Sequence, residues 1–162
     1  EDIINKQEPF SEWQIRNIHQ LILKNIDDEN AGRYRQQNVL ISGATSTPPD
    51  YTLLNDKMAQ LIDWYNNVAK TLHPIERAAK VHADFVSIHP FIDGNGRTSR
   101  LLINLELLKA GYPPCVITVE NRLAYYAALD QWTAYGKTKA FIQLVTDAVL
   151  EGFKPYQVVL DI

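Results

Sequence analysis

The stretch HPFIDGNGRTSR, residues 89–100, decides the interpretation of this chain. Pro90 disfavours helical backbone at the residue before it, so a helix is expected to end at His89 and to leave the imidazole beside a loop. Gly94 and Gly96 can both adopt positive φ angles without strain. Successive N–H groups in such a turn converge on an anion. The stretch therefore predicts an anion-binding loop that leads into a helix.

Charged groups in the same stretch suit a nucleoside triphosphate. Arg97 and Arg100 stand three apart in the first turn of the expected helix, where the helix dipole also favours an anion. Asp93 would repel phosphate unless a cation lay between them, and Mg²⁺ typically takes one or two carboxylates and its other ligands from phosphates and water. His89 is the nearby group whose ordinary pKa, about 6.5, suits a general base. Nucleotide, metal and base are therefore expected within one loop.

Two widespread phosphate-binding motifs do not explain this loop. No predicted strand precedes the glycines, and the third glycine of a dinucleotide-binding fingerprint is missing. The pattern GxxxxGK(S/T) is absent as well. Taken singly, a GNG turn, two surface arginines or a helix-ending histidine would be ordinary structural features. It is their joint occurrence with Asp93 that predicts a site.

Apolar residues at spacings of three and four predict three helices before the loop. Ser11 and Gln14 form a capping box for the first helix, Asp50 caps the second, and the third begins near Ile75 after His73-Pro74. Their apolar stripes are, in order, Ile15, Ile18, Ile22 and Ile26; Leu54, Met58, Leu61, Tyr65 and Val68; and Ala78, Val81, Phe85 and Ile88.

Three further helices are expected from the loop onward. The first, from Arg97 to Ala110, is apolar on nearly all sides, which predicts the central helix of the domain, and Gly111 ends it. The other two are expected from Thr118 to Leu129 and over residues 138–152. Before the second helix, Val39-Leu40-Ile41 is β-prone and is followed by turn-forming residues, which predicts a small β-hairpin over about 38–49, with a plain ordered loop as the alternative. The predicted fold is mainly α, with one hairpin, in a single domain over 1–162.

The composition narrows the class of protein. A chain with 46% hydrophobic and 22% charged residues is typical of globular proteins, and a net charge of -3 disfavours a broad nucleic-acid surface. The start, EDIINKQEPF, is unlike a signal peptide, and no apolar run approaches the ~20 residues of a membrane span. Cys115 is the only cysteine, which excludes an internal disulfide, and its apolar neighbours predict a buried residue rather than a reactive thiol. We expect a cytoplasmic protein that binds neither nucleic acid nor membranes.

The loop resembles the signature of the Fic (filamentation induced by cAMP) family, HxFx(D/E)GNGRxxR. The matching residues are His89, Phe91, Asp93, Gly94, Asn95, Gly96, Arg97 and Arg100. AGRYR (31–35), LHPIERAA (72–79) and AGYPP (110–114) extend the resemblance, which is strongest toward the branch with the animal endoplasmic-reticulum Fic enzyme and its bacterial relatives. The resemblance implies a Fic-type helical bundle whose hairpin is the flap. It also implies a protein adenylyltransferase, which moves AMP from ATP to a Ser, Thr or Tyr hydroxyl of a target protein and releases pyrophosphate.

The resemblance also implies roles for individual residues. His89 would take the proton of the attacking hydroxyl, and Asp93 would hold Mg²⁺ (or Mn²⁺). Phosphate oxygens would be bound by Gly94, Asn95, Gly96, Arg97 and Arg100. The adenine and ribose pocket would comprise Leu54, Tyr125, Tyr126 and Thr133, with core packing as the alternative for the two tyrosines. The flap would align the target backbone as an added strand through Val39, Leu40, Ile41, Ser42 and Gly43.

Two departures from the family pattern affect these expectations. Thr133 stands where close relatives often carry asparagine, which leaves one adenine contact open. Many members also carry an inhibitory helix, (S/T)xxxE(G/N), whose glutamate pairs with the last arginine of the loop. No such motif precedes the core. Near the C-terminus, Thr146 and Glu151-Gly152 resemble it, but the spacing between Thr146 and Glu151 is one residue too long. A missing inhibitory segment, an inhibitory partner or constitutive activity with self-modification are the open expectations.

Three alternatives to AMP transfer remain at this level. A Fic relative can move another group, such as phosphate, but Gly96 favours the ATP orientation of AMP transfer. Removal of AMP would rely on the inhibitory glutamate that is not found. A nucleotide-binding interaction module without catalysis is the third alternative, and the presence of His89 and Asp93 argues against it.

Overall fold

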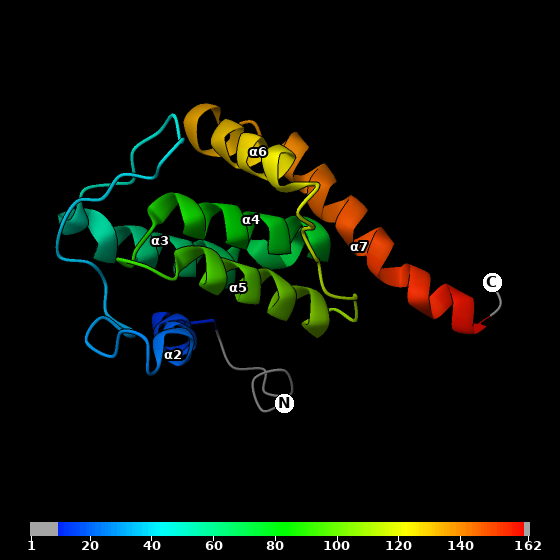
Figure 1. Cartoon of the computed structure of the whole chain (residues 1–162), viewed down its shortest axis with the longest axis horizontal. Helices are drawn as coiled ribbons and strands as arrows, with labels where there is room; N and C mark the ends of the chain where they lie inside the picture. Colours follow the sequence, from blue (N-terminus) through cyan, green and yellow to red (C-terminus); the bar gives the residue numbers. More distant parts are fainter. Residues whose placement is uncertain (1–9, 161–162) are drawn as a thin grey trace.

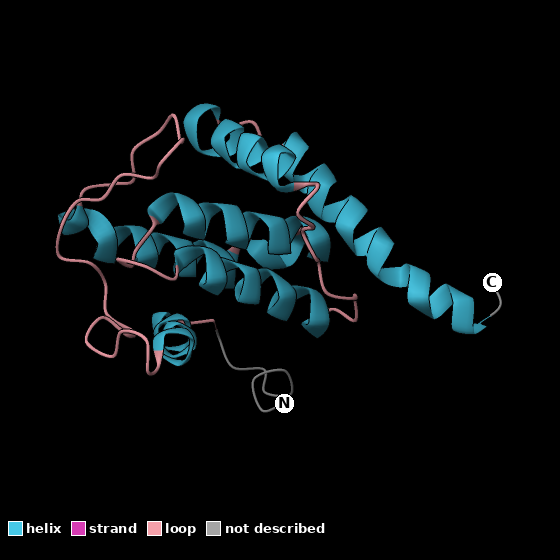
Figure 2. Cartoon of the chain, viewed as in Figure 1, coloured by secondary structure: helices cyan, strands magenta, loops and turns pink. Residues whose placement is uncertain are grey.

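The computed structural model describes residues 10–160, and these residues are helices and loops with no strand (Figure 2). The acidic stretch at residues 1–9 lies outside the described part. The helices are α2 (Glu12–Leu23), α3 (Leu54–Asn67), α4 (Pro74–Ile88), α5 (Asn95–Lys109), α6 (Arg122–Tyr135) and α7 (Lys139–Leu160), with short 3-10 helices η1 (Tyr51–Leu53) and η2 (Ala69–Thr71). The mainly α fold is confirmed. None of the described helices is long and apolar enough to cross a membrane.

Helix α4 occupies the centre of the bundle. It packs against α3, α5, α6 and α7, and lies between them in Figure 1. Its alanines let neighbouring helices approach closely, since Ala78, Ala79 and Ala83 are fully buried. The prediction that the helix after the loop is central was wrong, because Leu101 and Leu108 of α5 are exposed. Two buried apolar clusters result: one joins α4 and α5 to α6 and α7, and the other joins them to α2 and α3.

Local signals place the starts of the first helices. The capping box is formed: the Gln14 N–H donates to Ser11 Oγ (3.3 Å) and the Ser11 N–H to Gln14 Oε1 (3.1 Å). Asp50 accepts from the Thr52 N–H at 3.0 Å, but the helix that it caps is η1, which runs into α3. His73 caps α4, with Pro74 in the first turn. The predicted stripes are buried where they lie inside the helices, except that Ile22 and Tyr65 are only partly buried. Ile26 and Val68 lie beyond the helix ends and are exposed.

The later helices depart from their predicted bounds. Helix α5 begins at Asn95, two residues before the predicted Arg97. Helix α6 starts later than predicted because residues 118–121 form a turn, in which the Asn121 N–H donates to the Thr118 carbonyl at 3.2 Å. It ends at Gly136, which is left-handed (φ 65°). Helix α7 continues past residue 152, and Figure 1 shows its C-terminal half extending beyond the other helices.

Residues 38–49 form a loop instead of the predicted hairpin. One backbone hydrogen bond, from the Ala44 N–H to the Ile41 carbonyl (3.2 Å), closes a turn within it. A β-prone run forms a strand only if a neighbouring strand pairs with it, and Val39-Leu40-Ile41 has none among the described residues. Side chains hold the loop instead: the Asn38 amide donates to Asp50 at 2.7 Å and accepts from the Tyr51 N–H at 2.9 Å. The ordered-loop alternative describes this segment.

Candidate active site

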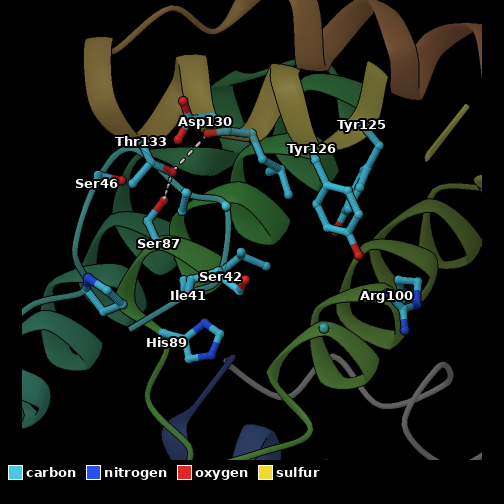
Figure 3. A pocket seen from close by; sticks show the side chains of 16 residues that line it. Ile41, Ser42, Ser46, Ser87, His89, Arg100, Tyr125, Tyr126, Asp130 and Thr133 are labelled. Carbon is cyan, nitrogen blue, oxygen red and sulfur yellow. Dashed lines mark hydrogen bonds between the residues drawn. The ribbon is translucent and has the colours of Figure 1, made fainter. Parts of the chain in front are cut away.

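A cleft of about 450 Å³ opens where the 38–49 loop, the end of α4, the start of α5 and one face of α6 meet (Figure 3). Its lining from the loop is Ile41, Ser42, Gly43, Ala44, Ser46 and Pro48. Helices α4 and α5 and the residue that ends α4 contribute Val86, Ser87, His89, Gly96 and Arg100. Helix α6 contributes Tyr125, Tyr126, Leu129, Asp130 and Thr133. Parts of the chain up to about ninety residues apart therefore share one cavity.

His89 ends α4 and borders this cleft. Its N–H donates to the Phe85 carbonyl at 3.0 Å, and the helix ends here because Pro90 blocks a further helical turn. The backbone of His89 is left-handed (φ 50°, ψ 57°). Burial lowers the pKa of His89 below 6.5, helped by the positive charge of Arg35 and opposed by the Val86 carbonyl and by Asp93. A lowered pKa keeps the imidazole neutral near pH 7, and a neutral ring can accept a proton.

The loop after His89 is anchored by Phe91 and Asn95. The Phe91 ring is fully buried and stacks on His19 with 3.5 Å between ring centroids. The Asn95 side chain accepts from the Phe91 N–H (2.9 Å) and donates to the Phe91 carbonyl (2.8 Å). Asn95 is 2% exposed, so its side chain is closed off from a phosphate and its backbone N–H is the group left for the predicted role.

Gly94 is required by the close approach of His19. Its backbone is left-handed (φ 77°), and a Cβ there would lie 3.0 Å from His19 Nε2. His19 Nδ1 accepts from the Gly32 N–H at 2.9 Å, so the proton lies on Nε2, which donates to the Asp93 carbonyl at 2.9 Å. Burial lowers the pKa of His19 and favours this neutral form. No local sequence pattern marks His19, because its partners are distant in the chain.

The two arginines of the loop take different positions. Arg100 borders the cleft, and a Cβ on Gly96 would lie 3.4 Å from its guanidinium. Arg97 instead pairs with Asp93, with 2.9 Å from Nη2 to Oδ2, on the exposed side of the loop. The first N–H groups of α5 have no partner within the helix and face the same end as both arginines. An anion at this end would meet backbone donors, the helix dipole and Arg100 together.

Asp93 is the carboxylate available for a metal here. The described residues hold no cluster of three or more His, Cys, Asp or Glu side chains that could bind a metal by themselves. Asp93 is exposed, and its carboxylate also accepts from the Gly94 N–H at 2.6 Å. A single carboxylate beside an anion-binding helix start fits Mg²⁺, which draws most of its ligands from phosphates and water. The donor set thus suits a metal that arrives with its nucleotide.

The residues predicted to bind the base take different positions in and around the α6 end of the cleft. Tyr125 is buried, and its hydroxyl lies 2.9 Å from His82 Nε2, so it serves both core and cleft. Tyr126 is 53% exposed and can offer its ring to a base. The hydroxyls of Thr133 and Ser87 form a hydrogen bond of 2.8 Å in the same wall of the cleft (Figure 3). Leu54, at 2% exposure, packs in the core and does not line the cleft, so its prediction was wrong.

The 38–49 loop reaches the cleft with only part of its predicted segment. Ile41, Ser42 and Gly43 line the cleft, whereas Val39 and Leu40 do not, and Leu40 is 84% exposed. Asp130 of α6 ties the loop down, because its two carboxylate oxygens accept from the Thr45 N–H (2.7 Å) and hydroxyl (2.6 Å). No sequence signal marked Asp130, which pairs with a residue 85 positions away.

Two other sequence observations resolve into structural roles. Thr146, Glu151 and Gly152 lie in α7, where Glu151 pairs with Lys154 at 2.6 Å. Cys115 is buried, and burial raises the pKa of its thiol to about 11. Thr146, Glu151 and Gly152 are therefore part of the last helix of the bundle. Cys115 is a packed thiol, as predicted.

The fold and the loop belong to a known class. Residues 9–107 match the Fic/DOC family. The chain is 42% identical over 132 residues to the protein adenylyltransferase fic-1 of Caenorhabditis elegans, covering 81% of this chain and 25% of that protein. It is 40% identical over 144 residues to the protein adenylyltransferase Fic of Nematostella vectensis, covering 88% of this chain and 33% of that protein. The structure of Fic-1 (aa134–508) from C. elegans superposes with a TM-score of 0.83 at 35% identity, over 94% of this chain and 44% of that one.

The chain therefore belongs to the Fic/DOC family. It spans about a quarter to a third of the length of these two curated relatives. The family assignment confirms the resemblance that the loop 89–100 first indicated.

Proposed function

We propose that this chain acts as one catalytic domain, a protein adenylyltransferase that transfers AMP from ATP to a hydroxyl of a target protein. The observation that carries the proposal is the shared cleft, in which His89, Arg100 and Tyr126 border one cavity. A base, a phosphate-binding cation and an aromatic surface are the parts that this reaction needs. Relatives at about 40% identity are named protein adenylyltransferases, which supports the same activity.

The chemistry proceeds by one displacement at the α-phosphorus. The hydroxyl oxygen of the target forms a bond to the α-phosphorus, the bond to the β-phosphate oxygen breaks, and pyrophosphate leaves. His89 takes the hydroxyl proton, which its lowered pKa and neutral ring permit. Arg100 and the first N–H groups of α5 hold phosphate oxygens.

Asp93 is the residue that would hold Mg²⁺, or Mn²⁺, at the exposed edge of the loop. When bound, the metal would neutralise phosphate charge and orient the triphosphate and its pyrophosphate leaving group. Asp93 now shares its carboxylate with Arg97 and the Gly94 N–H, so its oxygens are already turned toward the helix start. Arg97 thus holds the metal ligand, while Arg100 faces the cleft.

The 38–49 loop is proposed to receive the target. The segment Ile41 to Gly43 borders the cleft beside His89 and pairs with no strand among the described residues, although the Ile41 carbonyl accepts from the Ala44 N–H. Backbone groups outside a strand ladder can add an extended peptide in strand fashion. Such docking recognises backbone more than side chains, so it brings a hydroxyl to His89 without dictating its residue type.

Labelled ATP tests the proposal. The protein is incubated with Mg²⁺ and ATP carrying radioactive phosphate at the α or the γ position, and protein-bound label is counted. Label from the α position alone, lost in His89→Ala while ATP binding persists, supports AMP transfer. Label from the γ position alone would overturn it in favour of phosphate transfer. Tight ATP binding with no label from either position, even with a mixture of candidate target proteins, would overturn it in favour of a binding module.

A further inference from the structure

Arg35 is a buried cation that bonds to backbone carbonyls from three segments. It is 4% exposed. Its Nε–H donates to the His89 carbonyl at 2.9 Å, Nη1 to the Gln37 carbonyl at 2.8 Å, and Nη2 to the Pro49 carbonyl at 2.6 Å. Its backbone N–H also donates to the Pro90 carbonyl at 2.9 Å. One residue therefore joins the end of α4 to both ends of the 38–49 loop.

This arrangement is unusual for a buried charge. Removing a guanidinium from water is costly unless hydrogen bonds replace the lost solvation, and buried arginines commonly obtain this from a carboxylate. Among the described residues Arg35 forms no ion pair with a carboxylate. The planar fork of the guanidinium holds its donors in a fixed geometry. Its three acceptors are thereby kept in one relative arrangement.

The carbonyl of His89 is the acceptor that matters for the chemistry. His89 holds a left-handed backbone, which few residues other than glycine adopt without support. The bond from Arg35 Nε and the bond from the Arg35 N–H to Pro90 both support this backbone. The other two bonds of the guanidinium go to the carbonyls of Gln37 and Pro49, so both ends of the 38–49 loop are held by the side chain that also holds His89.

We propose that Arg35 is a positioning residue: its guanidinium fork sets the backbone of His89 and the base of the 38–49 loop together, so that the base and the docked hydroxyl keep one relative placement. The inference rests on the proposed AMP transfer. Arg35 does not line the cleft that is proposed to hold the nucleotide and the target. It acts through His89 and through the loop.

The charge of Arg35 adds a second, separable effect. Arg35 is one of the groups that hold the pKa of His89 down, after burial and against the Val86 carbonyl and Asp93. Arg100 and Asp130 also border the cleft, and Asp130 is engaged by Thr45. Removing the positive charge of Arg35 therefore raises the pKa of His89, and the base becomes protonated at a higher pH. A residue with a merely structural role would leave this titration unchanged.

Three variants separate the fork from the charge. Arg35→Lys keeps the charge but loses the three-armed fork, and Arg35→Met keeps much of the volume but loses both. Arg33→Met is the matched control, because Arg33 is exposed and lies only two residues away. For each folded variant we would measure kcat and the KM for ATP in self-labelling, the pH profile of kcat, the titration of the His89 ring by NMR, and hydrogen exchange over residues 38–49.

Arg35→Lys is expected to lower kcat by about 10²-fold, the loss typical of a misplaced catalytic group. Its KM for ATP and the acidic limb of its pH profile stay as in the wild type, and residues 38–49 exchange faster. Arg35→Met is expected to show the same losses. In addition, the acidic limb of its pH profile and the midpoint of its His89 titration move to higher pH. Arg33→Met matches the wild type in every measurement.

Wild-type kcat and loop exchange in Arg35→Lys would overturn the proposal, as would an unchanged His89 titration in a folded Arg35→Met. If Arg35→Met does not fold, Arg35→Lys carries the test alone. The NMR titration and the exchange measurement do not depend on AMP transfer. A wild-type protein that transfers no AMP would overturn the proposed function, and these two measurements would still decide the positioning role.

Discussion

The side chain of Asn95 satisfies both backbone groups of Phe91, accepting from its N–H at 2.9 Å and donating to its carbonyl at 2.8 Å. This pairing closes the loop between α4 and α5 on itself and keeps the Phe91 ring in the core. Asn95, which the sequence places at the centre of a phosphate-binding turn, thus stabilises that turn through its side chain. Its contribution is best separated from phosphate binding by stability measurements.

Replacing Asn95 with alanine is expected to destabilise the fold. The change leaves the N–H and the carbonyl of Phe91 buried without partners, which costs about 1–3 kcal/mol in the free energy of unfolding. Urea denaturation measures the loss. Asn67→Ala is the control, because the Asn67 amide bonds only to exposed Asp63 and its loss should cost less than about 0.5 kcal/mol. Equal stability of the two variants would contradict the bracing role.

Gly94→Ala should cost more than the same change at Gly111. Both glycines are left-handed, at φ 77° and φ 79°, so both changes carry backbone strain of about 1–2 kcal/mol. Only at Gly94 does the new Cβ also approach His19 Nε2, at 3.0 Å, while nothing lies within 4 Å at Gly111. Denaturation midpoints compare the two. AMP transfer should fall in Gly94→Ala alone, and identical behaviour of the pair would show that His19 gives way freely.

The rate of transfer should depend on pH through His89. Its pKa is lowered from 6.5 mainly by burial, so the ring stays neutral, and able to accept a proton, down to a pH below 6.5. The rate should be level near neutrality and fall only as pH drops through this lowered pKa. A kcat profile from about pH 5 to pH 8 measures the midpoint. An acidic midpoint above 6.5 would mean that burial does not control this base.

Loss of the Asp130 carboxylate should free the 38–49 loop. Asp130 accepts two hydrogen bonds from Thr45, and these bonds also lower the pKa of its carboxyl. Asp130→Ala is therefore expected to speed proteolysis within residues 41–48 while the helices stay protected. Asp147→Ala serves for comparison, since Asp147 bonds only to Gln143 on the surface of α7. Equal cleavage rates in wild type and Asp130→Ala would show that the loop is held elsewhere.

Tyr126 is expected to contribute to ATP affinity by stacking. It is half-exposed and borders the cleft, and base–aromatic stacking is worth about 1–3 kcal/mol. Tyr126→Ala should therefore raise the Kd for ATP by about 5–150-fold, measured by calorimetry. Tyr135→Ala, on the same helix but outside the cleft lining, should leave the Kd unchanged. Wild-type affinity in Tyr126→Ala would place the base elsewhere.

Features that depend on neighbouring residues were accessible from the sequence. The Ser11–Gln14 box and the Pro74 start of α4 form as predicted, because their partners lie within one helical turn. The ending of α4 at His89 and the turn at Gly94 follow from proline and glycine backbone preferences alone. The loop 89–100 carried the family assignment for the same reason, since its chemistry is contained in one short stretch.

Features that depend on distant partners were decided by the tertiary structure. Val39-Leu40-Ile41 is β-prone but meets no strand, and Leu54 is turned into the core by the packing of α3 on its neighbours. His19 reaches Asp93 across 74 positions, and Arg35 reaches His89 across 54.

The sequence by itself thus determined which residues can do the chemistry, because their types and local spacing carry it. Only the tertiary structure decided which residues hold them in place. A buried hydrogen bond between distant segments leaves no periodic trace in the chain and exists only once the helices have packed.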